Sequence, residues 1–415
     1  MHPVQSFPAF ARANARWLGG GLVLTFFSCL GQTFLIAQFS AQIRAEHALS
    51  HGDFGALYMI ATLASATTLA LIGRVVDEHR IASVATATIL ALAAACLLMA
   101  TARTALTLCL ALFLLRLFGQ GMMTHTAMTA MGRWFDVERG RAVSLCALGL
   151  PIGEALLPIA LVALLGVIDW RALWVGGAAL LVLLALPLAR VLLGTPRVPI
   201  AGESGALASS ARQWTRAEVL RDLPFWVVCT GALAPAFIGT SVFFHQGHLG
   251  EIKGWPPTLI AASFPAMSLA TVIVALATGQ LVDRVGARRL LPYFLVPLAL
   301  ACAVLALGTH PLAMPAFMLL LGTSMGISNT LLGAFWPEIY GTRHLGAVRS
   351  LVFAAMVLSS ALGPGLTGYL IDHGVPFETQ LLVMALYCVA AIASIVPVSR
   401  LLERRVALEA ASFGA

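Results

Sequence analysis

Two opposite charges, Arg116 and Glu154, lie inside long apolar stretches of the sequence and are the first candidates for chemistry. Each lies about eleven or twelve residues into its stretch, which at about 1.5 Å per helical residue is close to mid-membrane. An unpaired arginine at the centre of a membrane helix costs ~2.5–3.5 kcal/mol on insertion scales. We therefore expect Arg116 to bond to Glu154, to a backbone carbonyl or to an anionic substrate.

The same two charges suggest how two fluxes could be coupled. In one hypothesis, Glu154 or a histidine carries a proton while Arg116 alternates between Glu154 and the substrate, so that proton and substrate move in the same direction. In the competing interpretation, Arg116 and Glu154 form a permanent structural ion pair. The solute would then cross by facilitated diffusion.

Other polar side chains within the apolar stretches are candidates to line a solute pathway: Gln32, Thr33, Tyr58 and Asn329. Interhelical hydrogen bonds use the same residue types, so a structural role is the alternative for each of them. His245 lies towards the outer end of its stretch. A histidine titrates near physiological pH and could gate the pathway or bind the solute, the alternative being a satisfied histidine at a helix end.

The elements that must position these residues are the apolar segments themselves. Hydrophobic residues make up 60% of the 415 residues and charged residues 10%, and the mean hydropathy is +0.91. This composition excludes an ordinary water-soluble globule. Segments of about 20 residues suffice to cross a bilayer core. The sequence therefore predicts an all-α membrane protein with twelve spans, near 17–43, 53–73, 81–102, 105–131, 142–166, 170–193, 225–247, 257–281, 289–309, 312–336, 347–371 and 378–399.

A repeated polar turn divides the chain into two similar halves. The segment GRVVDEHR at 73–80 corresponds to GQLVDRVGARR at 279–289. Repeats of this kind are typical of transporter bundles related by an axis along the membrane normal. We predict an N-terminal six-helix bundle at 1–193, a cytoplasmic linker at 194–224 and a C-terminal six-helix bundle at 225–415, around a central cavity.

Basic residues give the orientation. The net charge of +7 comes largely from arginines in the short loops on the side of the N-terminus. By the positive-inside rule, both termini and the linker lie in the cytoplasm, which predicts a multi-pass protein of the bacterial cytoplasmic (inner) membrane. Topology explains the basic residues better than a nucleic-acid partner does, and none is expected.

The two turns, together with Arg116-Leu-Phe-Gly119-Gln-Gly121 and RWFDVERGRA at 133–142, resemble motifs of the major facilitator superfamily. The resemblance covers nearly the whole chain and implies that family's fold. It raises the interest of Arg116, because the arginine of that motif is associated with proton coupling.

The resemblance also implies a conformational latch. In the family, contacts around these turns hold the cytoplasmic side shut in one state and break in the other. The alternative interpretation is that these are solvated turn residues that set topology. The latch residues that the resemblance implies are Gly73, Asp77, Arg80, Gly279, Asp283, Arg284, Gly286, Arg133 and Arg141.

The segments FHQGHL at 244–249 and PEIYGTRHLGAVRS at 337–350 are similar to the monocarboxylate and oxalate-type branches. One mid-membrane arginine in a largely apolar cavity, with Phe243, Phe244 and Trp336 nearby, also suits a small organic anion. The span near 257–281 has no mid-membrane arginine and the span near 347–371 has no lysine. The resemblance to those branches implies an anion clamp at these places, and this clamp is missing.

The sequence thus predicts a secondary active transporter that moves a small organic anion, such as a monocarboxylate, by alternating access with proton coupling. The alternative substrate class is a hydrophobic compound or drug expelled by proton-coupled efflux. A membrane-embedded enzyme and a non-transporting sensor have no distinguishing feature in the sequence. No phosphate-binding loop or metal spacing appears, so no cofactor or metal is expected. The expected partners are the solute, a proton and the lipid bilayer, and we expect a monomer.

Overall fold

The computed structural model describes residues 7–135, 138–195, 197, 213–341 and 343–413, which form helices joined by short turns. The chain divides into two compact units. Unit 1 comprises Met1–Leu49 and Leu57–Ser204, and unit 2 comprises Ser50–Ala56 and Gly205–Ala415. The first residues of one long helix, α5, therefore group with unit 2. The domain boundaries expected from the sequence stay a prediction, and most of the expected linker lies outside the described residues.

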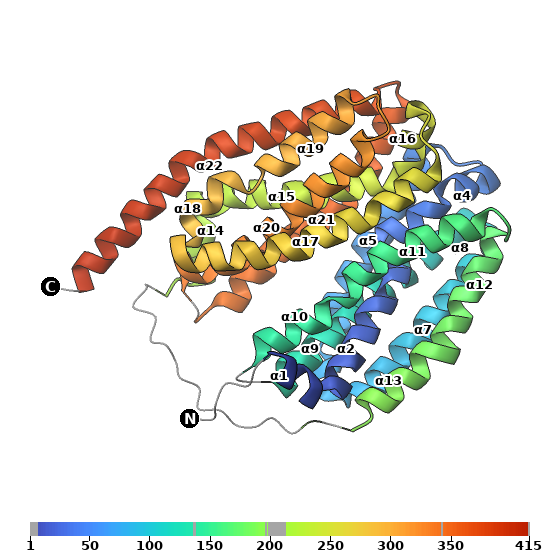
Figure 1. The fold of residues 1–415 in the computed structure, drawn as a ribbon, viewed down its shortest axis with the longest axis horizontal. Helices are drawn as coiled ribbons and strands as arrows, with labels where there is room; N and C mark the ends of the chain where they lie inside the picture. Colours follow the sequence, from blue (N-terminus) through green and yellow to red (C-terminus); the bar gives the residue numbers. More distant parts are fainter. Residues whose placement is uncertain (1–6, 136–137, 196, 198–212, 342, 414–415) are drawn as a thin grey trace. The chain divides into compact units, whose positions relative to one another are not determined.

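Unit 1 is drawn in blue to green in Figure 1. Its elements are α1 (Phe7–Ala13), α2 (Ala15–Phe27), η1 (Ser28–Gly31), α3 (Thr33–Ile36), η2 (Ala37–Phe39), α4 (Ser40–His47), α5 (His51–Ile72), α6 (Val75–Glu78), α7 (Ile81–Thr101), α8 (Ala105–Leu114), η3 (Leu115–Met123), α9 (Thr124–Trp134), α10 (Arg139–Ala147), α11 (Gly149–Leu165), α12 (Trp170–Leu180), η4 (Leu181–Ala185) and α13 (Leu186–Leu193).

Unit 2 is drawn in yellow-green to red in Figure 1. Its elements are α14 (Arg216–Arg221), α15 (Leu223–Phe244), α16 (Gln246–Lys253), α17 (Pro257–Val285), α18 (Ala287–Leu290), η5 (Leu291–Tyr293), α19 (Val296–Leu307), α20 (Ala313–Tyr340), α21 (Leu345–Asp372) and α22 (Phe377–Phe413).

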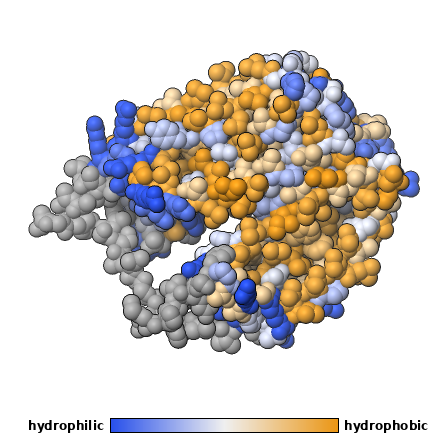
Figure 2. Space-filling view, viewed as in Figure 1, coloured by the Kyte–Doolittle hydropathy of each residue, from blue (hydrophilic) through white to orange (hydrophobic). Residues whose placement is uncertain are grey.

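The helices confirm the all-α membrane class. Within the described residues, eleven helical segments are long and apolar enough to cross a bilayer, and a bent pair, Ala15–Gly31 with Thr33–His47, supplies a twelfth span. Many leucines on these helices are exposed, and apolar side chains cover much of each unit's drawn face (Figure 2). In a bilayer this is the expected surface, because lipid is as apolar as leucine.

The first span differs from the continuous helix expected at 17–43, because it bends by 45° at Gln32. Gln32 adopts an extended backbone, with φ −85° and ψ 150°. The bend lies where a second span crosses: a Cβ added at Gly31 would lie 2.1 Å from Leu115 O and 2.7 Å from Gly119 Cα. Only glycine permits this approach of two backbones.

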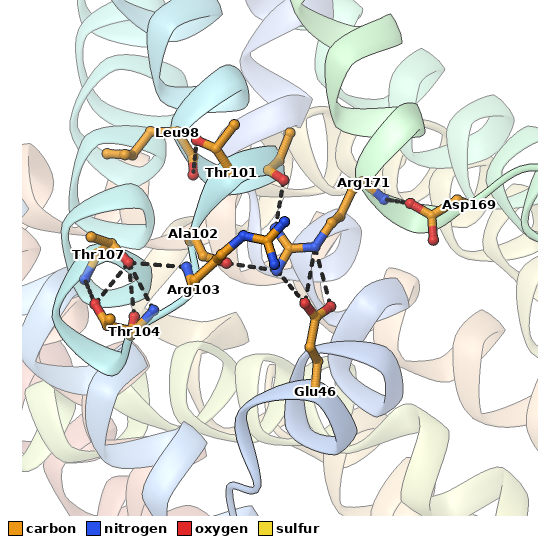
Figure 3. A network of polar contacts seen from close by, with 10 residues as sticks. Glu46, Leu98, Thr101, Ala102, Arg103, Thr104, Thr107, Asp169 and Arg171 are labelled. Carbon is orange, nitrogen blue, oxygen red and sulfur yellow. Dashed lines mark hydrogen bonds and ion pairs between the residues drawn. The ribbon is translucent and has the colours of Figure 1, made fainter.

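A cluster of charged side chains holds together three helix ends of unit 1. Arg171, at the start of α12, forms an ion pair with Glu46 on α4 at 2.5 Å, and its guanidinium donates to the carbonyls of Ala100 and Ala102 at 2.5 and 2.6 Å. Asp169 Oδ1 accepts from the Arg171 N–H at 2.9 Å and caps α12. Figure 3 shows this cluster, which joins α4, the end of α7 and the start of α12.

Candidate functional site

The candidate site of unit 1 is built around Arg116, whose side chain is only 2% exposed. Arg116 lies in η3, a nine-residue π-helix within the span Ala105–Trp134. Its Nη1 donates to Gly31 O at 3.1 Å and to Thr33 Oγ1 at 3.4 Å. Its Cζ lies 5.3 Å from the centre of the Tyr58 ring, so a cation–π contact completes the group.

The carbonyl that Arg116 binds is left over by the bend at Gln32. In a continuous helix Gly31 O would accept from the N–H of Leu35, four residues on. Here the N–H groups of Leu35 and Ile36 both donate to Gln32 O, each at 3.2 Å. A buried carbonyl needs a partner, and the guanidinium supplies it. The bend therefore provides an acceptor for Arg116, and Arg116 satisfies the carbonyl that the bend leaves without a helical donor.

Tyr58, on α5, is fully buried and links the two sides of this group. Its hydroxyl lies 2.6 Å from Thr33 Oγ1, which also accepts from Arg116. The oxygens that contact Arg116 in the described part of the chain are thus neutral, and Arg116 Nε is buried with no hydrogen-bond partner there. The positive charge is stabilised by dipoles and an aromatic ring rather than by a carboxylate.

Glu154 lies on α11 and is half-buried. The preceding residue, Gly153, packs against η1: a Cβ added there would lie 2.3 Å from Cys29 Sγ. Arg116, on η3, also contacts η1, because its Nη1 donates to Gly31 O. No ion pair joins Arg116 and Glu154, both of which are described residues. Of the three partners expected for Arg116, the structure shows the backbone carbonyl, and the permanent ion pair is not formed.

The remaining predicted pathway residues do not join this group. Gln32 is half-buried at the bend itself. Asn329 is exposed on α20 of unit 2. His245 is 2% exposed at the end of α15, where its Nε2 lies 3.1 Å from Pro364 O and its ring 5.8 Å from that of Phe377. Their roles in transport stay predictions.

The turn at 73–80 is held inside unit 1 by two side chains from α9. Arg133 Nη1 donates to Val76 O at 2.8 Å, and His125 Nε2 lies 3.1 Å from Gly73 O. Asp77 and Arg80 are exposed and line a polar cavity of about 310 Å³ together with Arg133.

The corresponding turn of unit 2 is held by an anion that the sequence did not single out. Glu338, on α20, accepts from the Ala287 N–H at 2.8 Å and lies 3.4 Å from Arg288. Within this turn, Gly286 separates α17 from α18 and has φ +89°, a conformation that favours glycine. The glutamate lies within the segment at 337–350 that resembles the monocarboxylate branches, and this resemblance was the available signal.

The remaining latch residues are Asp283, Arg284, Arg141 and Gly279. Asp283 and Arg284 are exposed near the end of α17. Arg141 pairs with Glu138, within its own helix start, at 3.0 Å. An added Cβ at Gly279 would meet only the Thr330 methyl, at 3.8 Å. The latch as a whole stays a prediction.

A second cluster that sequence reasoning missed ties the end of the linker region to unit 2. Asp222 is 8% exposed, accepts from Tyr340 OH at 2.8 Å and pairs with Arg405 on α22 at 2.8 Å. The backbone N–H of Trp214 donates to Tyr340 O at 3.1 Å, and the Arg405 guanidinium lies 5.0 Å from the Trp214 ring centre. These residues are too far apart in the sequence to be grouped by spacing.

Comparisons with known proteins agree with this fold. No match is found among curated protein sequences. Among solved structures, the chain resembles a bacterial homologue of the human lysosomal transporter Spinster, inward-facing and unoccupied, with a TM-score of 0.70, 15% identity and coverage of 94% of this chain and 98% of that one. It also resembles the nucleoside transporter NupG, with a TM-score of 0.70, 14% identity and coverage of 93% and 98%.

At such identities, these structures show the fold alone. The family is shown by a sequence profile, described as Major Facilitator Superfamily, which matches residues 21–364 and 242–413. Together the two matches take in nearly all of both units. The chain therefore belongs to the Major Facilitator Superfamily and is a membrane transporter rather than an enzyme.

Proposed function

We propose that the chain is a secondary active transporter of a small organic anion, a monocarboxylate in class, and that Arg116 is the group that recognises the anion. The observation that supports this is the guanidinium itself, which is buried at mid-span and contacts neutral oxygens. A desolvated cation without a carboxylate attracts an anion strongly, because the local dielectric is low. A carboxylate also matches the guanidinium fork.

The backbone around Arg116 is suited to a change of partner. A π-helix and a bent span meet there, and both are irregular elements that occur frequently at functional sites. The bonds of Arg116 to Gly31 O and Thr33 Oγ1, at 3.1 and 3.4 Å, are ones that a substrate carboxylate would replace. The freed carbonyl would then need another donor, which a small local shift of η1 would provide.

We further propose that Glu154 carries the coupled proton, with His245 as the alternative carrier. Glu154 is half-buried on α11 and follows the glycine that packs on η1. A negative substrate beside Arg116 would favour the protonated form of a nearby carboxyl group. Substrate and proton would then cross in the same direction. The alternation of Arg116 between Glu154 and substrate stays a prediction about the transport cycle.

Flux measurements on reconstituted protein test both proposals. Liposomes carrying the parent protein are expected to accumulate a labelled monocarboxylate such as lactate when an inward pH gradient is imposed. Glu154→Gln is expected to exchange lactate across the membrane without concentrating it. Accumulation equal to that of the parent would remove Glu154 as the proton carrier. Resistance of cells to hydrophobic drugs, without carboxylate flux, would instead favour the efflux alternative.

The orientation is proposed from the charge pattern: a bacterial inner membrane with both termini cytoplasmic. The latch at the two repeated turns is proposed from the family resemblance, and a monomer is expected. A cysteine placed at position 204, outside the described residues, tests the topology in a cysteine-depleted background. It should resist a membrane-impermeant thiol reagent added to intact cells. Labelling from outside would reverse the orientation.

A further inference from the structure

One span in each unit ends with the same backbone geometry. In unit 1, α7 ends at Thr101, and the next residue, Ala102, has φ −62° and ψ 126°. In unit 2, α19 ends at Leu307, and Gly308 follows with φ −73° and ψ 124°. The last carbonyls of a helix have no donor within the helix. Each of these two ends therefore needs a donor from another part of the chain.

In unit 2, a lysine supplies the donor. Lys253, the last residue of α16, donates through Nζ to Ala306 O at 3.1 Å and to Gly308 O at 3.2 Å. Its side chain is 8% exposed, and Glu378, near the start of α22, lies 3.5 Å away. A cation at a helix C-terminus is also favoured by the helix dipole. This cluster joins α16, α19 and α22, as the Arg171 cluster of Figure 3 joins α4, α7 and α12.

The two clusters occupy corresponding places in the duplicated halves. The repeated turns begin at residues 73 and 279, which are 206 residues apart. The same shift relates the bound carbonyls of the two units without a gap, and it relates the charged residues to within one position. The corresponding pairs are Ala100 with Ala306, Ala102 with Gly308, Glu46 with Lys253 and Arg171 with Glu378. The acceptors are thus retained, and the sign is reversed at both charged positions.

An exchange of the two charges preserves what the helix end requires. In unit 1 the cation comes from α12 and the anion from α4, whereas in unit 2 the cation comes from α16 and the anion from α22. A buried cation needs an anion nearby, because its desolvation is costly. By the topology proposed above, both cations lie on the outer side, where lysine and arginine are scarce. Their presence in both halves therefore calls for a reason, and the two helix ends supply one.

We propose that the two clusters are one clamp, duplicated with the halves, in which the two charges have exchanged places. In each unit the clamp caps α7 or α19 and holds its end to the first and last spans of that unit, so that the three helix ends move together. The cation comes from either neighbouring span, provided that the anion comes from the other. The clamp is a property of the fold and is independent of the solute and of Arg116.

The test exchanges the charges of unit 2 in the full-length protein, purified in detergent. Lys253→Glu alone places two acids at the end of α19. It should lower the midpoint of thermal unfolding by about 5–10 °C, because breaking a buried ion pair is costly. Adding Glu378→Arg rebuilds the arrangement of unit 1 and should restore more than half of that loss. If Lys253→Glu does not fold, recovery of folded protein by the double variant is the corresponding result.

Hydrogen exchange in lipid nanodiscs locates the effect, because a clamp acts at one place. Lys253→Met should raise the exchange of backbone amides at the end of α19 and the start of α22, and leave that of α17 unchanged. Glu378→Gln keeps the contacts of Lys253 with the two carbonyls and should give a smaller rise. Glu251→Gln, at an exposed glutamate on α16 outside the clamp, is the matched control for the loss of one carboxylate. It should change neither exchange nor the thermal midpoint.

Two results would overturn the proposal. If Lys253→Glu with Glu378→Arg is no more stable than Lys253→Glu, the cation cannot come from either span, and the two clusters are not the same device. If exchange in Lys253→Met rises evenly over unit 2, Lys253 supports the unit as a whole and does not hold one helix end.

Discussion

The two units use close glycine contacts in different ways. In unit 1, Gly31 and Gly119 bring η1 against η3 where the first span is bent, and the bend leaves a carbonyl for Arg116. In unit 2, Gly322 and Gly326 of α20 lie against Met267 O and Thr271 O of α17, and both helices are continuous. A continuous helix satisfies its own carbonyls, so it creates no polar site. The carbonyl that holds Arg116 is therefore a product of the broken backbone of unit 1.

The two repeated turns differ in the sign of the charge that holds them. In unit 1, a cation, Arg133, donates to the Val76 carbonyl. In unit 2, an anion, Glu338, accepts from the Ala287 N–H and pairs with Arg288. A side chain can hold a turn by bonding to a free carbonyl or to a free N–H. A cation suits the carbonyl, which is partly negative, and an anion suits the N–H, which is partly positive. Both turns are therefore held by a charged side chain, but the sign of the charge differs between the two units.

The largest expected effect follows from replacing the cation that distinguishes unit 1. Arg116→Lys keeps the charge and loses the planar fork that bonds Gly31 O and Thr33. Hydrogen bonds to charged groups contribute about 1.5–3 kcal/mol, so we expect lactate uptake into liposomes to fall about 10- to 100-fold. The midpoint of thermal unfolding in detergent serves as the control for folding. Uptake at the parent rate would show that Arg116 does not recognise the substrate.

The glycine contacts can be compared directly by adding one methyl group to each unit. Gly31→Ala and Gly322→Ala place a Cβ 2.1 Å from Leu115 O and 2.2 Å from Met267 O. Each should lower the free energy of unfolding by about 1–3 kcal/mol or more, as overpacking does. Of the two, Gly31→Ala should also impair uptake, because it displaces the carbonyl that Arg116 binds.

The control for these glycines is Gly176→Ala on α12, where an added Cβ meets no atom within 4 Å. It should be neutral or stabilise the helix by about 0.5–1 kcal/mol. Equal thermal midpoints for Gly31→Ala and Gly176→Ala would show that the backbones at the bend are not in forced contact.

A smaller effect is expected from removing one hydroxyl next to Arg116. Tyr58→Phe deletes the bond of 2.6 Å to Thr33 Oγ1 and keeps the ring beside the guanidinium. A neutral hydrogen bond contributes about 0.5–1.5 kcal/mol, so the concentration of lactate that gives half-maximal uptake should shift by no more than about 10-fold. A loss as large as that of Arg116→Lys would assign Tyr58 a direct contact with the solute.

The smallest effects should come from the two turns. Arg133→Gln and Glu338→Gln each keep a hydrogen-bonding group and remove the charge, so each should cost about 0.5–1.5 kcal/mol of folding stability. Raising the salt concentration should weaken the parent's Glu338–Arg288 pair, which is partly exposed, and should bring parent and Glu338→Gln closer together. An unchanged difference in thermal midpoint at high salt would mean that Glu338 acts through the Ala287 N–H rather than through its charge.

The class, the helical fold and the approximate positions of the spans were predictable from the sequence, because each depends on local composition. A run of about 20 apolar residues has few alternatives to a membrane helix, and the repeated turn at 73–80 and 279–289 reports a duplication whatever the structure. Arg116 and Tyr58 were also recognisable as candidates, since polar groups inside apolar spans are expensive and need a reason.

The tertiary structure alone decided which partners those side chains have. Arg116 and Glu154 are expected at similar depths, because depth follows from position along a helix. Whether two such groups meet depends on the faces that the helices turn to each other, and here Arg116 faces the bend at Gln32. The bend and the role of Glu338 both depend on contacts between segments distant in the sequence. Such contacts leave no periodic signal in a single chain.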